Sequence, residues 1–380
     1  MRKWGLYLVV VLVAVAVRVP FLDYRSGDYI RYLGPWSEFI ETHGGFRALE
    51  HEFSNYNAPY LCLMAAASYL PWSSLLSVKL ISLSFELLLA WNVQRVLALR
   101  YPTGHLPLIG AAVVLLLPTI VLNGSMWGQA DSTYAALCLA GLYHLLCRRP
   151  VRAGVYFGLA LAFKLQTVFI FPALLLFALR RELPLRALAM IPLTYLLLDV
   201  PAILLGADWR RLLLVYLRQS GADTQLTVNA PSIYALLDLD PALRRLCVLG
   251  AGVVLLALVA IAVRARLTDE RMVLYVAASA LLTPYLLPSM HERYFYLAEV
   301  LTVVAAFWRP RLLPVPVLLQ VAAVSTYLNY FLRPRQIGDL RVLAVLLAVA
   351  IGVLLGWLLT SRPAPDEVRG RSGQRRLTAT

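Results

Sequence analysis

Polar and ionisable side chains gather in six short stretches of a chain that is otherwise strongly apolar. In chain order, the stretches are SGDYIRYLGPW (26–36), SNYNAPY (54–60), NGSMWGQADS (123–132), FKLQ (163–166), TVNAPSIYALL (227–237) and MHERYFY (290–296). They contain carboxylates, cations, amides and aromatic rings, which are the groups that acid–base catalysis and anion binding require. These stretches are therefore the candidate functional segments of the chain.

The first stretch offers a candidate general base. A carboxylate can take a proton from a hydroxyl nucleophile, and Asp28 is the acid that we assign to this role. It lies in a segment, 23–45, whose aromatic and aliphatic residues recur at helical spacing before a Gly-Gly pair. This pattern predicts an amphipathic helix lying along a membrane interface. Asp23 is the alternative base, although it could instead cap the preceding helix or pair with Arg25.

Three basic side chains are candidates for binding a phosphate group. His291 and Arg293 stand at the start of an apolar run, where a helix N-terminus favours anions. Lys164 stands alone among apolar residues. The alternatives are an interface-anchored helix for the first two and a snorkelling lysine for the third. Glu292 lies between His291 and Arg293. Its negative charge interacts favourably with the dipole of a helix N-terminus, whatever further role it has.

The stretch NGSMWGQADS has the residue types that bind a pyranose ring. Trp127 can stack on the apolar face of a sugar, and Gln129 and Asp131 can hydrogen-bond its hydroxyls. A helix end followed by the first turn of the next helix explains part of the same pattern. Capping is also an alternative for Asn57. The further candidates for substrate binding are Tyr56, Asn57, Gln166, Asn229 and Glu292.

Composition identifies the setting of these residues as a membrane. Hydrophobic residues make up 60% of the 380 residues and charged residues only 15%. Apolar runs of about 20 residues recur, and each is long enough to span a bilayer as a helix. We therefore predict an all-α, polytopic transmembrane helical bundle of about 12–13 helices. Expected helices lie near 4–22, 58–98, 105–122, 130–147, 153–164, 167–180, 186–206, 245–264, 271–288, 294–308, 312–331 and 341–360.

Two of these regions are irregular. The segment 58–98 is long enough for two helices, with a break at Pro71-Trp72. The helices at 153–164 and 167–180 are short for full spans, and we expect them to meet near Lys164.

Arginine and lysine clusters predict the orientation of the bundle. Positive charge marks cytoplasmic loops, so both chain ends are expected inside the cell. Most acidic residues, together with Lys164, His291 and Arg293, then fall on the outer side. Because ionisable groups at membrane depth are costly and usually functional, this convergence predicts a polar cavity open to the outer face.

The predicted domain organisation is a transmembrane domain at 1–361 and a disordered, basic, cytoplasmic tail at 362–380. The four cysteines lie in or beside apolar runs without metal-like spacing, so we expect free thiols. The net charge of +14 does not indicate nucleic-acid binding, because the basic residues lie between apolar runs and not on one soluble face.

The six stretches, in this order, resemble the GT-C superfamily of integral-membrane glycosyltransferases over roughly residues 1–310. The likeness is greatest to bacterial relatives of the GPI-type mannosyltransferases and to dolichyl-phosphate-sugar-dependent enzymes. It implies a GT-C-type bundle, a polyprenyl-phosphate-linked sugar as donor and transfer on the extracytoplasmic side. It also implies that an acid in the first outer loop, Asp28, is the base, and that the segment around His291 and Arg293 lies near the donor phosphate. Leu165 departs from the pattern, where relatives often have proline.

The expected function is transfer of mannose or another hexose, with inversion, to a hydroxyl of a lipid-linked or cell-envelope acceptor. The expected partners are the lipid-linked donor, that acceptor and membrane lipids, with no cofactor, metal or nucleic acid. A transporter or flippase for a lipid-linked or anionic solute is the alternative. Transporters often carry paired repeats and place their charges at the midplane, whereas this sequence shows no internal repeat and gathers its charges at one face.

Overall fold

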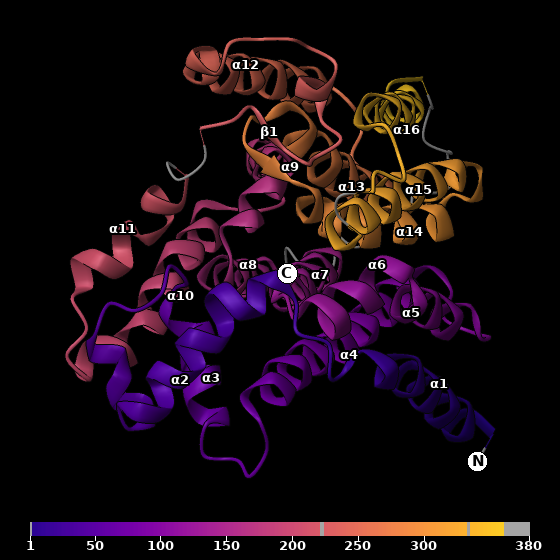
Figure 1. Cartoon of the computed structure of the whole chain (residues 1–380). Helices are drawn as coiled ribbons and strands as arrows, with labels where there is room; N and C mark the ends of the chain where they lie inside the picture. Colours follow the sequence, from indigo (N-terminus) through magenta and orange to yellow (C-terminus); the bar gives the residue numbers. More distant parts are fainter. Residues whose placement is uncertain (1, 221–223, 333–334, 361–380) are drawn as a thin grey trace. The chain divides into compact units, whose positions relative to one another are not determined.

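The computed structural model describes residues 2–220, 224–332 and 335–360 (Figure 1). These residues are almost entirely helical, which confirms the predicted fold class. The chain divides into two compact units, and each is described by itself. Unit 1 comprises 1–168 and 183–225, and unit 2 comprises 169–182 and the described residues from 226 onward. The tail predicted at 362–380 lies outside the described residues.

Unit 1 holds ten α-helices among its described residues. They are α1 (Arg2–Arg18), α2 (Gly34–Thr42), α3 (Ala58–Ala67), α4 (Ser74–Arg100), α5 (Leu106–Leu116), α6 (Pro118–Val121), α7 (Asp131–Leu146), α8 (Pro150–Phe163), α10 (Leu185–Leu204) and α11 (Trp209–Ser220). Short helical turns connect them: η1 (Val19–Phe21), η2 (Tyr29–Leu33), η3 (Gly45–Glu50) and η4 (Leu122–Trp127), with η2 and η4 wound as π-helix. η5 (Leu165–Ile170) leads out of the unit.

The centre of unit 1 is a row of packed helices. α8 packs against both α7 and α10, and α4 packs against α7 and α5. Small residues explain the closest approach: a Cβ on Gly154 would lie 2.0 Å from the carbonyl oxygen of Ala187, and one on Gly158 would lie 2.6 Å from that of Ile191. A Gly-x-x-x-Gly spacing on α8 therefore lets its backbone contact α10, as is common between membrane helices.

Unit 2 holds the remaining described elements. They are α9 (Phe171–Leu179), β1 (Thr227–Val228), η6 (Ile233–Ala235), η7 (Pro241–Leu243), α12 (Arg244–Val263), α13 (Asp269–Leu286), β2 (Met290–His291), η8 (Glu292–Phe295), α14 (Tyr296–Trp308), η9 (Pro310–Leu312), α15 (Pro314–Phe331) and α16 (Leu340–Thr360). α13 packs against α14 and α16, and α15 packs against α16. β1 and β2 form a short parallel pair, with Thr227 opposite Met290 and Val228 opposite His291.

Five described helical segments are long and apolar enough to cross a membrane: Ser74–Arg100, Leu185–Leu204, Pro241–Val263, Pro310–Phe331 and Leu340–Thr360. A sixth is present if Leu106–Leu116 and Pro118–Trp127, bent by 55°, form one broken span. The bend follows from Pro118, because a residue before proline is restricted to extended conformations and Leu117 adopts one. The other apolar helices among the described residues are shorter than a full span.

The irregular regions resolve in specific ways. Segment 58–98 forms two helices, α3 and α4, and the Ser73 side chain caps the second by accepting from the Leu76 amide. The predicted interfacial helix within 23–45 is η2 followed by α2, and it ends before Gly44 and Gly45, which both have positive φ. After Asn229 the chain forms a single 3₁₀ turn, η6 (Ile233–Ala235).

Candidate functional site

The chain that leads from α1 to Asp28 is held by a buried lysine on α4. The Lys79 ammonium donates to the backbone carbonyls of Phe21, Leu22 and Tyr24, at 2.6, 2.8 and 2.7 Å. Three charge-assisted bonds to carbonyls within four residues fix the path of this short segment. Lys79 therefore positions the start of the loop on which Asp28 lies.

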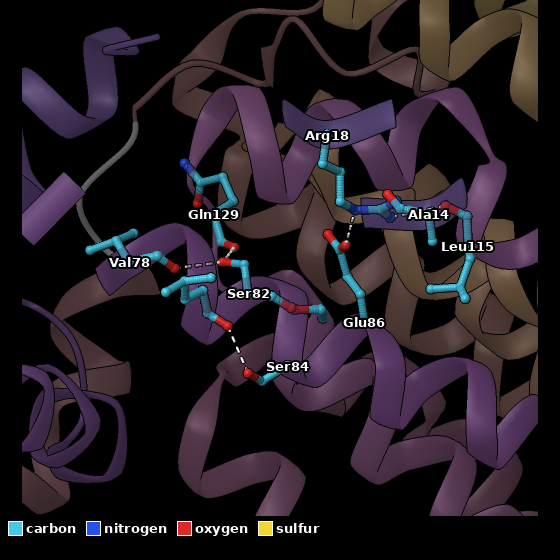
Figure 2. Close-up of polar contacts among 10 residues, drawn as sticks. Ala14, Arg18, Val78, Ser82, Ser84, Glu86, Leu115 and Gln129 are labelled. Atoms are coloured by element: carbon cyan, nitrogen blue, oxygen red, sulfur yellow. Dashed lines mark hydrogen bonds and ion pairs between the residues drawn. The ribbon is translucent and has the colours of Figure 1, made fainter. Parts of the chain in front are cut away.

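The end of α1 is fixed to the same helix by a buried ion pair (Figure 2). Arg18 Nε donates to Oε2 of Glu86 at 2.7 Å, and both side chains are almost fully buried. The two terminal nitrogens of Arg18 donate to the carbonyls of Ala14 and Leu115. The backbone of α1 and α5 therefore binds both terminal nitrogens of this buried pair, whereas Oε1 of Glu86 has no hydrogen-bond partner among the described residues.

Asp28 is the half-buried acid to which the segment 123–129 supplies hydrogen-bond donors. Trp127 Nε1 donates to Asp28 Oδ2 at 3.1 Å, and Gln129 Nε2 donates to the same oxygen at 2.5 Å. The Ser26 hydroxyl, two residues before the acid, donates to the Trp127 carbonyl at 2.6 Å. The structure thus joins the first and third sequence stretches around one carboxylate, whose orientation these bonds fix.

Gln129 is itself positioned from α4. The Ser82 hydroxyl donates to the Gln129 carbonyl at 2.7 Å, as Figure 2 shows. The Ser132 hydroxyl in turn donates to the Ser82 carbonyl at 3.0 Å. Gln129 is only 3% exposed, so its amide is held inside the unit.

Asp131 and Lys164 form a second buried pair. The Lys164 ammonium donates to Asp131 Oδ1 at 2.5 Å, and the Asn123 amide donates to Asp131 Oδ2 at 2.9 Å. Asp131 is fully buried, and the Tyr60 phenol is close enough to interact with its charge. The bonds connect the beginning of α7 with the end of α8. Lys164 therefore neutralises a buried carboxylate, an arrangement that neither sequence interpretation of this lysine included.

The remaining unit 1 candidates have structural contacts. Asn57 occupies the N-cap position of α3, but its side chain makes no cap bond and donates instead to the Ala162 carbonyl at 3.1 Å. The Tyr56 ring lies 5.1 Å from that of Trp36 and 5.2 Å from that of Tyr60. Gln166 is buried just after α8, and its Oε1 has no hydrogen-bond partner among the described residues.

Unit 2 brings the fifth and sixth sequence stretches together. β1 and β2 pair, Asn229 bridges to His291, and the Ser289 amide donates to the Leu226 carbonyl at 2.8 Å. Asn229 has a φ of 60° and donates from its side chain to the Thr326 carbonyl at 3.1 Å. Asparagine tolerates this left-handed backbone better than most residues. The pairing fixes His291 at the start of η8.

The cationic residues of this segment are partly exposed, whereas its acid is buried. Arg293 lies against the Tyr294 ring, 5.7 Å from its centroid, and His291 meets the same ring edge-on at 5.1 Å. Glu292, between them, is only 2% exposed. His291 and Arg293 are both half-buried, and Nε of Arg293 is itself buried.

Sequence reasoning missed four residues that organise the site. They are Ser26, Lys79, Ser82 and Asn123. Lys79 carried a usable signal, because a charged residue inside a long apolar helix needs buried partners. Ser26 and Ser82 carried none, since they bond to backbone carbonyls far away in the sequence.

The profile of glycosyltransferase family 87 matches residues 53–289 of the chain. The chain belongs to glycosyltransferase family 87. Family 87 is of the GT-C type, so the resemblance seen in the six stretches is confirmed. The chain is accordingly a multi-pass membrane glycosyltransferase, and membership of family 87 favours this class over the transporter alternative.

The fold of this family 87 member is similar to that of ArnT from Cupriavidus metallidurans, in a crystal structure with bound undecaprenyl phosphate. The TM-score is 0.58 at 15% sequence identity, and the match covers 94% of this chain and 78% of ArnT. At this identity the likeness shows a shared fold. No curated protein sequence matches the chain significantly.

Proposed function

We propose that this family 87 enzyme transfers a hexose, mannose in the first instance, from a polyprenyl-phosphate donor to a hydroxyl of a lipid-linked or cell-envelope acceptor. The observation that carries the proposal is the carboxylate of Asp28, which is oriented by Trp127 and Gln129 on a loop that a buried lysine fixes. A second support is the undecaprenyl phosphate bound to ArnT, whose fold is similar.

Asp28 is assigned as the general base. As the acceptor hydroxyl attacks the anomeric carbon, its proton passes to the Asp28 carboxylate, and the bond between that carbon and the phosphate oxygen breaks. Attack from the face opposite the leaving group inverts the anomeric configuration. Holding the carboxylate in one orientation before reaction lowers the entropic part of the barrier. This base requires no further residue to accept the proton.

His291 and Arg293 are assigned to the phosphate of the donor. The leaving group departs as polyprenyl phosphate, so negative charge grows on its bridging oxygen during the reaction. Cationic and N–H donors that meet this charge stabilise the transition state. Arginine matches phosphate with two parallel N–H donors, and imidazole adds one more.

Trp127, Asp131 and Lys164 are assigned positioning roles. The Trp127 indole is fully buried, so protein atoms surround it, and its N–H meets the proposed base. Lys164 is also buried, and its ammonium donates a hydrogen bond to Asp131. The roles that the sequence predicts for these three residues, namely sugar stacking by Trp127, hydroxyl binding by Asp131 and phosphate binding by Lys164, remain predictions.

Direct sugar contacts are assigned to a further set of residues: Tyr56, Asn57, Gln129, Gln166, Asn229 and Glu292.

The transfer assay is the direct test of this function. Purified enzyme in lipid nanodiscs would be given polyprenyl phosphates carrying radiolabelled mannose, glucose or galactose, with a cell-envelope lipid extract as acceptor. We expect transfer from one donor, and an anomeric configuration in the product opposite to that of the donor. Retention of configuration would contradict the single-base mechanism. Transfer from a nucleotide sugar but from none of the lipid donors would contradict the donor class.

The extracytoplasmic location of the reaction has its own test. A single cysteine at the exposed position of Glu50 should react with an impermeant maleimide added to intact cells, whereas one at Arg266 should react only after lysis. The wild-type chain, with its four free cysteines, measures the background. Labelling in the reverse order would place the Asp28 loop in the cytoplasm.

A further inference from the structure

A cleft beside α11 shares one residue, Tyr56, with the residues assigned above. It lies in unit 1 as an open cleft of about 450 Å³, a volume that includes the solvent at its mouth. The residues that line it are His51, Glu52, Phe53, Ser54, Asn55, Tyr56, Leu61, Arg211, Leu212, Val215 and Arg218. The lining thus combines two guanidinium groups with aromatic rings.

Arg211 is the residue that points to a ligand. Its half-buried guanidinium makes one hydrogen bond among the described residues, a long one of 3.4 Å to the Leu49 carbonyl. Glu52 and Asp208 lie close enough to interact with its charge, but neither forms an ion pair with it among those residues. Burial lowers the pKa of Arg211, which the two carboxylates oppose. Most of its five N–H donors therefore remain available to an acceptor.

Arg218 lies at the exposed edge of the same cleft. It pairs with Glu52 at 2.7 Å, and more than half of each side chain is exposed. An exposed pair of this kind contributes little to stability and can exchange partners at small cost. An incoming anion can therefore recruit Arg218 without dismantling the fold.

The outer face of α11 indicates where the cleft lies in the membrane. Trp209, Leu213 and Leu217 follow each other at helical spacing and are 52%, 40% and 69% exposed. Leu212 and Val215, on the other side, are buried against the unit. A helix with an apolar outer face, an exposed tryptophan and flanking arginines is typical of the membrane interface. The cleft is therefore at the depth of lipid head groups, beside an apolar surface that suits acyl chains.

The inner side of α11 is rigidly attached. The Tyr216 hydroxyl donates to the carbonyls of Leu161 and Ala162, at 2.6 and 3.2 Å, and burial raises the pKa of Tyr216 well above its ordinary value. The phenol therefore stays a donor at physiological pH. The attachment fixes α11, and with it Arg211 and Arg218, against the end of α8.

We propose that this cleft binds the phosphate of an anionic lipid head group, with Arg211 as its principal donor. Guanidinium and phosphate match in two parallel hydrogen bonds, which lysine cannot reproduce. Phe53 and Tyr56 supply apolar contact for the glycerol or sugar part of the head group, and the outer face of α11 receives the chains. The site depends on the membrane location of the enzyme and not on the identity of its base or donor.

The test is a binding measurement with short-chain lipids. Purified protein in a non-ionic detergent would be titrated with dioctanoyl-phosphatidylglycerol, with uncharged dioctanoylglycerol and with inorganic phosphate. We expect Arg211→Gln to weaken binding of the anionic lipid about 10- to 100-fold, the usual effect of losing charge-assisted bonds. Arg210→Gln, one residue earlier and exposed, is the matched control and should bind within about twofold of wild type.

Each outcome bears on the proposal. Anionic lipid that binds far better than phosphate or the uncharged lipid, and that needs Arg211, supports a lipid head-group site. Arg211-dependent binding of inorganic phosphate at the same affinity supports the phosphate chemistry and assigns its source to free anions. Equal binding to wild type and Arg211→Gln overturns the proposal. If Arg211→Gln does not fold, Arg211→Lys and Arg218→Gln replace it, and undiminished lipid binding in both overturns the proposal.

Discussion

The Trp127 indole donates a hydrogen bond of 3.1 Å to the Asp28 carboxylate, although 99 residues separate the two in the chain. In the other direction, the Ser26 hydroxyl, on the same loop as Asp28, donates a hydrogen bond to the Trp127 carbonyl. The two segments therefore hold each other in one register. The proposed base is placed by this mutual arrangement and not by its own loop alone.

Removing the indole N–H should slow catalysis without weakening donor binding. Trp127→Phe keeps an aromatic ring in the buried space but loses the bond to Asp28. We expect kcat to fall about tenfold, the effect of losing one hydrogen bond to a charged group, with the donor KM nearly unchanged. Trp308→Phe is the matched control, because this buried indole has no hydrogen-bond partner among the described residues. Equal kcat values in the two variants would remove Trp127 from the site.

Removing the proposed phosphate ligand should weaken donor binding and also slow the chemical step, because the same contact stabilises the leaving phosphate in the transition state. Arg293→Ala should raise the donor KM about 10- to 100-fold, because a charge-assisted contact to the donor is lost. Arg311→Ala, an exposed arginine in η9, is the control and should behave like wild type. Steady-state kinetics with varied donor concentration separate the two parameters. An unchanged kcat/KM for the donor in Arg293→Ala would transfer the phosphate role to another cation.

The Asp131–Lys164 pair should be coupled in stability. Asp131→Asn or Lys164→Met alone leaves one buried charge without its partner, and we expect each to lower the unfolding free energy by about 3–5 kcal/mol. The double variant should recover part of this loss, because no unpaired charge remains. Denaturant unfolding in mild detergent measures the three variants. Losses that simply add would show that the two groups do not interact.

The exposed pair formed by Glu52 and Arg218 is the internal control for this cycle. Both side chains are more than half exposed, so Glu52→Gln should change stability by only about 0–1 kcal/mol. A loss as large as that of the buried pair would mean that burial does not determine the difference.

Gly124 should tolerate no side chain. A Cβ at this position would lie 2.0 Å from Oε1 of Glu86, whose carboxylate is fixed by Arg18. Gly124→Ala should therefore displace the buried pair and lower stability by about 1–3 kcal/mol, the usual result of overpacking. Gly252→Ala on α12 is the control, since a Cβ there meets nothing within 4 Å. Equal melting temperatures of the two variants would contradict the packing at Gly124.

The helical plan could be predicted from the sequence because each membrane helix carries its own signal. The helix α12, Arg244–Val263, is apolar from Leu246 onward, and the predicted helix at 245–264 differs from it by one residue at each end. Pro71 predicted the break between α3 and α4 in the same local way. The pairing of β1 with β2 could not be predicted, because it joins Thr227 to Met290, far apart in the chain, and no local pattern signals it.

The residues of the candidate site were predicted better than their contacts. Asp28, Gln129 and Asp131 stood out because polar residues are rare in such a chain. Their partners could not be read from sequence, since Trp127 and Lys164 each carried plausible local interpretations. Both bond instead to carboxylates on other elements. Such choices depend on three-dimensional packing, which one sequence does not encode in any local pattern.

The most direct measurement is turnover by the Asp28→Asn variant. Asparagine keeps the size of the side chain and can still accept from Trp127 and Gln129, but it cannot take the proton of an acceptor hydroxyl. We expect folding and donor binding to persist while kcat falls by about two to four orders of magnitude, the usual range for loss of a general base. Asp23→Asn, five residues earlier and exposed, should retain most of the activity. Turnover of Asp28→Asn equal to that of the wild type, on the same donor and in the same nanodiscs, would contradict the account.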